Sequence, residues 1–337
     1  MISFATVMFI RTTRVDRRRF IVWALAASVL APLATFAQRA GKPARVAVLS
    51  SSTPETRSTF WDAFRGEMKR LGWTEGQDLV YVYRYTRGDS ARFDALAAEL
   101  VAEKPDLIYA SSVGGALAAK RATREIPIVF GFVSDPVGLG LVASLARPGG
   151  NATGFSSLGD EVSAKYLELL KEVQPKLRRV SVLAREGSGS LLFTQVELAG
   201  HAAGIEVNAV AVDDLDRISQ AFQSLARQRP DGVVVQPAFI VEARQVAERM
   251  AKLRVPAIYS IPEMVAAGGL MSYGAETADN LRRAAGYVDR ILKGANPADL
   301  PVQQPQSFEL VVNLKAARAQ GIKIPQSVLL RATKVIE

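Results

Sequence analysis

Hydroxyl-bearing residues and glycines follow several short apolar runs that are rich in β-branched side chains. The candidates in the first half of the chain are Ser51, Ser52, Ser111, Ser112, Gly114, Ser134, Asp135, Thr153, Gly154 and Ser156. Backbone amides at a helix N-terminus, assisted by the helix dipole, suit a carboxylate or another small anion. These residues therefore predict a polar wall of a ligand site.

A second group of candidates follows later apolar runs and has a different chemistry. It consists of Arg185, Gln236, Phe239, Tyr259 and Ser272. Aromatic and amide groups can cover an apolar or aromatic part of a ligand while hydroxyls fix its orientation. The two groups together predict a small organic ligand that meets a different wall at each end.

Several kinds of chemistry are excluded by the residue types. The chain has no cysteine and a single histidine, His201, which removes disulfides, thiolate metal sites and classical catalytic triads. It contains neither a GxGxxG fingerprint nor a GxxxxGK[ST] phosphate loop, so we expect no nucleotide or other cofactor and no metal. Asp135 before Pro136 fits a helix N-cap, and Ser260 with Glu263 fits a capping box. No catalytic set remains, and we expect no enzyme.

The positive charge does not predict a nucleic-acid partner. The net charge is +9, of which the first 37 residues carry +4. The remaining lysines and arginines are scattered and form no basic stripe with interleaved aromatic residues.

The N-terminus resembles an export signal. Arg17, Arg18, Arg19 and Phe20 precede an apolar run, residues 21–37, that ends in small residues at Ala37. This pattern predicts a twin-arginine signal peptide over residues 1–37, cleavage near Ala37 and a periplasmic location. An uncleaved anchor is the alternative, because about 18 apolar residues nearly span a bilayer.

Apolar runs alternate with helical patterns along the rest of the chain. Strands are expected at 45–50, 79–85, 106–110, 126–132, 179–184, 205–212, 232–236, 256–259, 269–273 and 307–312. Helices are expected at 55–71, 90–103, 114–124, 160–173, 190–203, 215–228, 239–252, 277–293 and 313–320. This rhythm predicts α/β layers with parallel sheets, and 337 residues exceed one hydrophobic core.

The stretch 134–154 is expected to link two lobes. A short helix would begin after Asp135 and end at Pro148-Gly149-Gly150, and residues 152–155 would then leave the first sheet. We expect two doubly wound parallel-sheet lobes with an interlobe cleft and three crossover segments. Lobe 1 would comprise residues 43–153 plus 276–300, and lobe 2 residues 154–275 plus 301–337.

Five segments carry a resemblance to a known family. They are Arg17–Phe20, LGWTEGQDL (71–79), IPIVF (126–130), GLGLVASLARPGGNATG (138–154) and the tail 284–337. The chain resembles the ABC-transporter substrate-binding proteins of the tryptophan-binding type, which are type I periplasmic binding proteins. The resemblance implies a monomer that closes two lobes on a small molecule and delivers it to an ABC permease in the inner membrane.

The resemblance also implies roles for single residues. Ser111 and Ser112 would take a carboxylate and Asp135 an amino group, as in relatives that bind aromatic amino acids. The loop 185–190 departs from the family pattern, so an amino acid is one ligand class beside other aromatic or carboxylate-bearing compounds. Two other functions remain open: a ligand-sensing receptor module for a membrane sensor, and an exported α/β enzyme.

Overall fold

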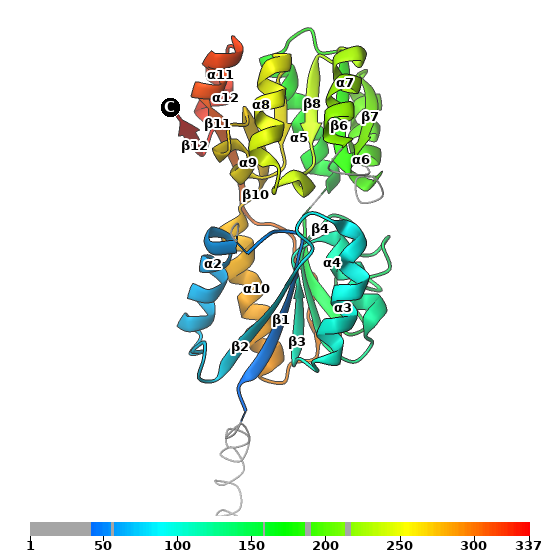
Figure 1. Ribbon diagram of the computed structural model, residues 1–337, viewed down its shortest axis with the longest axis vertical. Coiled ribbons are helices and arrows are strands. Elements are labelled where there is room, and N and C mark those ends of the chain that lie inside the picture. Colours follow the sequence, from blue (N-terminus) through cyan, green and yellow to red (C-terminus); the bar gives the residue numbers. More distant parts are fainter. Residues whose placement is uncertain (1–41, 55–56, 158, 186–189, 213–216) are drawn as a thin grey trace, which may run out of the picture. The chain divides into compact units, whose positions relative to one another are not determined.

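Two β-sheets lie within the unit Pro43–Glu337 of the computed structural model (Figure 1). The structure describes residues 42–54, 57–157, 159–185, 190–212 and 217–337. The predicted signal peptide lies outside these residues. Within the described ranges, no helix combines the length and the apolar character needed to cross a bilayer.

The first sheet is parallel throughout. Its strands are β1 (Ala44–Ser50), β2 (Leu79–Tyr85), β3 (Leu107–Ala110), β4 (Ile128–Val133) and β5 (Ala152–Ser156), in the order β2-β1-β3-β4-β5. The central strands are buried on both faces, which explains their continuous apolar sequences.

Helices cover both faces of this sheet, as Figure 1 shows. One face carries α2 (Arg57–Arg70) and α10 (Thr277–Leu292). Trp61 and Phe64 of α2 pack on the ring of Tyr109 in β3. The other face carries α3 (Phe93–Ala102) and α4 (Val113–Ala122), which pack on β1, β3 and β4. Two 3-10 turns, η1 (Ser90–Arg92) and η4 (Pro297–Asp299), complete this lobe.

The second sheet repeats the same plan with two additional strands. Its strands are β6 (Arg179–Arg185), β7 (Glu206–Val212), β8 (Gly232–Val235), β9 (Ala257–Tyr259), β10 (Met271–Ala275), β11 (Phe308–Asn313) and β12 (Lys334–Ile336), in the order β12-β11-β10-β9-β8-β6-β7. The strands β6 to β10 are parallel, whereas β11 runs antiparallel to β10 and β12 runs along β11.

The helices of the second lobe bury apolar faces of helical period. One face of the sheet packs against α5 (Gly159–Val173), α6 (Ser190–Ala203) and residues of α11 (Leu314–Gln320) and α12 (Gln326–Arg331). The other packs against α7 (Ile218–Gln228), α8 (Ala243–Leu253) and α9 (Pro262–Ala266). In α7 the buried residues are Ile218, Ala221, Phe222 and Leu225, a spacing that places them on one stripe.

The chain passes between the two sheets three times. It leaves the first sheet after β5, returns after β10 to form α10, and leaves again after Gln303 to form β11. The expected fold class, two doubly wound α/β lobes, is therefore confirmed. The residue limits of the two lobes stay a prediction.

Two expectations for the stretch 134–154 are wrong. Residues 136–146 form turns and bends rather than a helix, because the chain has glycines at 138 and 140 and Gly140 takes a φ of +69°. Residues 152–155 do not leave the first sheet but form its edge strand β5, which pairs with β4. The strand β12 and the helix α12 were not expected from the sequence.

Gly154 allows β5 to approach β4 closely. Its φ is +155°, and a Cβ atom at this position would lie 2.0 Å from the carbonyl oxygen of Phe130. The contact lies beside a register shift between Phe130 and Val133. Only a residue without a side chain fits this backbone contact.

We therefore expect Gly154→Ala to lower the free energy of unfolding by about 2–4 kcal/mol, because the strand must move or distort. The matched control is Gly286→Ala in α10, where nothing lies within 4 Å of the added Cβ. That change should stabilise the helix by about 0.5–1 kcal/mol. Urea unfolding followed by circular dichroism measures both variants, and equal midpoints for them would contradict this account.

Candidate functional site

Each sheet has a switch point, the place where the strand order reverses direction, and the two switch points lie at equivalent strands. In the first, β1 lies between β2 and β3, and in the second, β6 lies between β7 and β8. The connections from the two strands that flank the switch point run in opposite directions, which opens a crevice at the carboxyl ends. Ligands of open α/β sheets bind there, so the residues after β1, β3, β6 and β8 are the first candidates.

Serines occupy the switch point of the first sheet. The Ser50 Oγ and the Ser52 Oγ lie 2.9 Å apart, and the Ser111 amide donates to the carbonyl oxygen of Leu49 at 3.0 Å. The Ser112 Oγ accepts from the Gly115 amide at 3.3 Å and caps α4. Ser51 directly follows β1 and is half-buried. The structure thus brings Ser51, Ser52, Ser111 and Ser112 to one end of the sheet.

Other candidates of this lobe have structural contacts. Gly114 faces Phe93, whose ring carbon would lie 2.7 Å from an added Cβ, so this position packs α4 against α3. The Thr153 hydroxyl is fully buried and donates to the carbonyl oxygen of Leu300 at 2.6 Å. The Ser156 hydroxyl donates to the carbonyl oxygen of Ser134 at 3.5 Å. Gly114, Thr153 and Ser156 therefore each have a structural role within the first lobe.

Asp135 caps a turn at the carboxyl end of β4. Its Oδ1 accepts from the Gly138 amide at 2.8 Å, and both Ser134 and Asp135 are half-buried. Phe132, in the same strand, has a φ of +57°, an uncommon conformation for a residue with a side chain. Backbone strain of this kind gathers at functional sites, and no sequence pattern indicated it.

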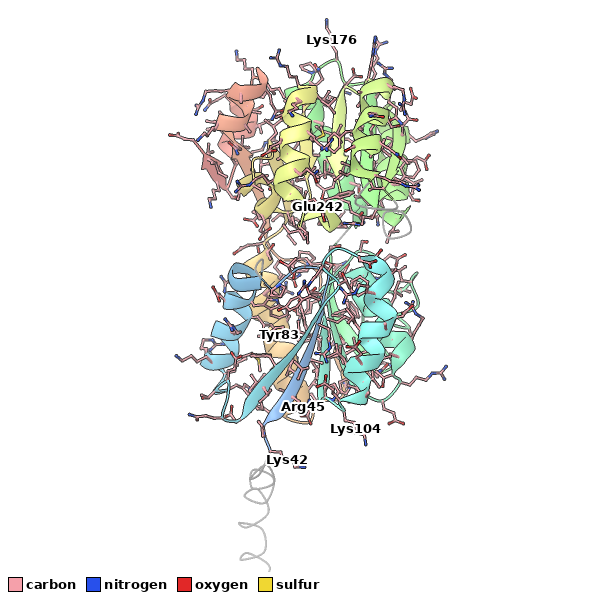
Figure 2. The ribbon with its side chains drawn as sticks, in the orientation of Figure 1. Lys42, Arg45, Tyr83, Lys104, Lys176 and Glu242 are labelled. Atoms are coloured by element: carbon pink, nitrogen blue, oxygen red, sulfur yellow. The ribbon has the colours of Figure 1, made fainter. Side chains whose placement is uncertain are left out.

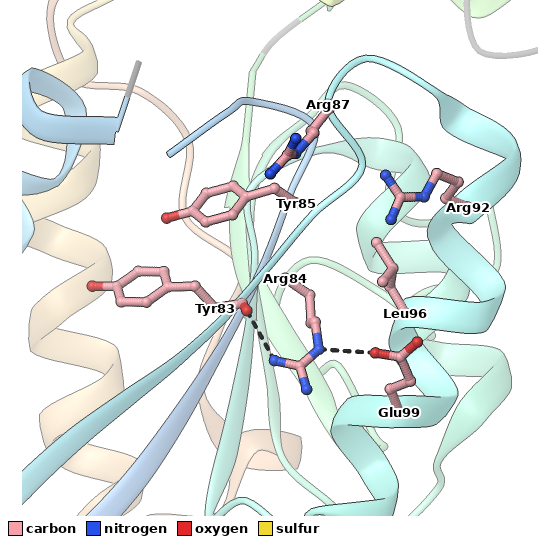
Figure 3. Close-up of a pocket in the computed structure, with 7 residues that line it drawn as sticks. All are labelled: Tyr83, Arg84, Tyr85, Arg87, Arg92, Leu96 and Glu99. Atoms are coloured by element: carbon pink, nitrogen blue, oxygen red, sulfur yellow. Dashed lines mark hydrogen bonds and ion pairs between the residues drawn. The ribbon is translucent and has the colours of Figure 1, made fainter. Parts of the chain in front are cut away.

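The edge strand β2 brings tyrosines and arginines together, as Figure 3 shows. Tyr83 and Tyr85 point to one side, where their rings stack at 5.9 Å, and Arg84 points to the other, where it bonds Glu99 at 2.9 Å. These residues line a surface pocket, to which Arg87, Arg92 and Leu96 also contribute. Tyr85 ends β2 at the same edge as the serines, and sequence reasoning did not select it.

Arg185 and Gln236 occupy the switch point of the second sheet. Arg185 ends β6, Gln236 follows β8, and the Gln236 Oε1 accepts from the Arg185 amide at 2.8 Å. The Arg185 guanidinium is 5.4 Å from the centre of the fully buried Phe239 ring. The structure therefore brings together three residues that the sequence predicted separately.

A further charged residue, Glu242, joins this cluster. Its Oε2 lies 3.4 Å from an Nη of Arg185, and the exposed fractions of the two side chains are 11% and 6%. Burial raises the pKa of Glu242, while the charge of Arg185 opposes this effect. In Figure 2, Glu242 and Lys176 mark opposite ends of the second lobe.

Tyr259 and Ser272 are neighbours in the sheet. Their strands pair so that the two residues lie in register, and both are 1% exposed. No hydrogen-bond partner is found for the Tyr259 hydroxyl or for the Ser272 Oγ within the described part of the chain. Burial raises the pKa of Tyr259, so its phenol stays protonated.

Glu263 does not belong to a capping box. The helix α9 has Ile261 at its N-cap, and the Ser260 hydroxyl donates to the carbonyl oxygen of Val235. Burial raises the pKa of Glu263 to about 7, and the nearby charge of Glu309 adds to this effect. The capping interpretation is wrong because proline at 262 moves the helix start beyond Ser260.

The described residues hold no group of three or more metal-binding side chains. The serines and Gln236 can form hydrogen bonds to a ligand, and Arg185 adds a guanidinium, which suits ligand binding. A model of the family described as ABC transporter substrate binding protein matches residues 45–336. The chain is also similar to a tyrosine-binding protein of Clostridioides difficile (strain R20291), at 29% identity over 76% of each chain.

Two solved structures are similar over nearly the whole described chain. A conserved domain protein of Vibrio cholerae O1 biovar El Tor has a TM-score of 0.80 and 29% identity, covering 87% of this chain and 100% of that one. An ABC domain from Streptococcus pneumoniae in complex with L-Trp has a TM-score of 0.79 and 25% identity, with coverages of 88% and 100%.

The raised pKa of Glu263 predicts a pH dependence of stability. The folded state holds this proton more tightly than the unfolded state, whose pKa is near 4.5. Stability is therefore lost as the pH rises towards 7, by up to roughly 3 kcal/mol. We expect Glu263→Gln to unfold like the wild type at pH 4.5 and to be more stable than it at pH 8.

The matched control is Glu248→Gln on the exposed side of α8. This variant should follow the wild-type profile at both pH values. Thermal unfolding at a series of pH values gives the comparison. A Glu263→Gln variant that is less stable than wild type at pH 8 would contradict the assignment.

Proposed function

The chain belongs to the ABC transporter substrate-binding protein family, and on this basis we propose that it is the periplasmic solute-binding component of an ABC importer. It binds an amino acid or another aromatic or carboxylate-bearing compound between its lobes and delivers it to a permease in the inner membrane. No chemical conversion of the ligand is part of this function.

One observation carries the proposal. Each lobe has polar side chains at its own switch point, serines in the first and the Arg185–Gln236 pair in the second. A ligand held from both sides is a means of closing two lobes about their crossing segments. Three crossings connect the sheets, which allows such a hinge.

The ligand class is supported by two relatives. The curated relative is called a tyrosine-binding protein, and one similar structure contains L-Trp. Both names concern aromatic amino acids. Tyr85 and Phe132 at the carboxyl ends of β2 and β4 are aromatic residues that can contact such a ring in this chain.

We expect ligand binding to raise the thermal stability of the mature chain. Thermal melts are recorded with L-tryptophan, L-tyrosine, other amino acids, aromatic acids and small organic acids. A ligand at 100 times its dissociation constant should add about 2.7 kcal/mol to the free energy of unfolding. Small-angle scattering with the same ligand should show a decrease in the radius of gyration, since the lobes close.

Glucose, a neutral sugar without a carboxylate or an amino group, is the control and should give no shift. If no compound of the panel changes the melt, the proposal of a solute-binding role for this compound class is wrong. A stabilising ligand that leaves the scattering curve unchanged would contradict closure.

Export through the twin-arginine route is a separate expectation. We expect the mature chain from the periplasm to begin near Gln38, as measured by mass spectrometry of its N-terminal peptide. Replacing Arg17 and Arg18 by lysine should strongly reduce the periplasmic fraction. Unchanged export of this variant would contradict the route.

A further inference from the structure

Arg185 is a buried cation whose hydrogen-bond donors are only partly paired. Its side chain is 6% exposed, and its ion pair with Glu242 has a length of 3.4 Å. Its backbone amide is used separately by Gln236. Within the described residues, its buried Nε has no acceptor at all.

A buried, partly paired guanidinium is unfavourable unless another group supplies the missing hydrogen-bond acceptor. A guanidinium has five N–H donors in a planar fork and cannot lose its charge. Leaving one buried donor without an acceptor destabilises the folded state, and more so when the group is charged. A 3.4 Å contact lies beyond the usual range of 2.7–2.9 Å for a charged pair and compensates for this only in part.

The position of the side chain is nevertheless well fixed. The Phe239 ring lies 5.4 Å from the guanidinium carbon and Glu242 holds one Nη, so the fork has a defined orientation. Arg185 is also the last residue of β6, at the switch point where a ligand of this sheet is expected. A fixed guanidinium with an open donor at that place matches the planar, bidentate geometry of a carboxylate.

The serines of the first lobe are the competing carboxylate site. The Ser112 Oγ already accepts from the Gly115 amide, and the Ser111 Oγ lies 3.4 Å from the Leu49 carbonyl oxygen. Both side chains are neutral, and each has one local hydrogen-bond contact within the first lobe. Arg185 is charged and is not satisfied.

We propose that Arg185 binds the carboxylate of the ligand through its guanidinium fork, so that this protein selects acids over their neutral amides. The inference rests on the solute-binding role proposed above and adds the chemical group that the second lobe recognises. It assigns the ligand's carboxylate to Arg185 at the end of β6, whereas the family resemblance implied Ser111 and Ser112. Glu242 and Phe239 are positioning residues for the guanidinium.

The first test compares each acid with its amide on the wild-type protein by isothermal titration calorimetry. The pairs are L-tryptophan with L-tryptophanamide, L-tyrosine with L-tyrosinamide, and phenylacetate with phenylacetamide. We expect each acid that binds to do so about 10- to 100-fold more tightly than its amide. Equal affinities would overturn the role of Arg185 and leave the solute-binding role intact.

Variants then locate the preference. Arg185→Gln should reduce the acid-over-amide ratio to near one, and Arg185→Lys should retain part of it because the charge stays while the fork is lost. The matched control is Arg179→Gln, an exposed residue at the opposite end of the same strand, which should keep the wild-type ratio. Ser111→Ala should also keep it.

The outcomes separate the two proposals. If Ser111→Ala abolishes the acid preference and Arg185→Gln does not, the carboxylate lies on the first lobe and the inference is wrong. The inference is also wrong if the protein binds only compounds without a carboxylate. If no compound of the wider panel binds to the wild type, the solute-binding role fails as well. The comparison on wild type needs no variant, so it holds even if Arg185→Gln does not fold.

Discussion

The parallel pairing of one interior strand with two neighbours creates the candidate ligand crevice at the carboxyl end of each sheet. β1 pairs with β2 on one side and β3 on the other, and β6 pairs in the same way with β7 and β8. Parallel neighbours need crossover helices, which leave the carboxyl ends of the strands free of covering elements at the switch point. The same constraint in both sheets yields two equivalent candidate sites, which differ in their side chains.

The contrast between the two sites lies in how their polar groups are satisfied. In the first lobe, Ser52, Ser112 and Asp135 have local partners that fix their side chains or backbone. In the second, Arg185 Nε, the Tyr259 hydroxyl and the Ser272 Oγ have none within the described part of the chain. Buried polar groups without partners are unfavourable, so a ligand that hydrogen-bonds to these three groups gains the most there.

Much of this arrangement could be predicted from the sequence. Alternating apolar runs and helical patterns were sufficient for the two α/β lobes. The strand ends were sufficient to place Arg185 and Gln236 at one edge of the second sheet, while their role in binding stays a prediction. Glu242 was missed because it follows a 3-10 turn, η3 (Pro237–Phe239), whose geometry carries no periodic signal. Thr153 and Gly154 were selected by residue type, but the backbone contacts of β5 use them inside the lobe. Hydroxyls and glycines occur both in ligand sites and in structural backbone contacts, and only the three-dimensional contacts distinguish the two roles.

The two candidate sites also differ in charge, and this difference affects how strongly each one discriminates between ligands. The first switch point offers hydroxyls and amides, which bind anions and neutral polar groups alike and so discriminate weakly between them. The second places a fixed guanidinium beside a carboxylate whose own pKa burial raises. A ligand that brings a second carboxylate to this place relieves the unsatisfied donor, whereas a neutral ligand leaves it buried and unpaired. Specificity in such a site arises from the penalty on the wrong ligand at least as much as from the attraction of the right one.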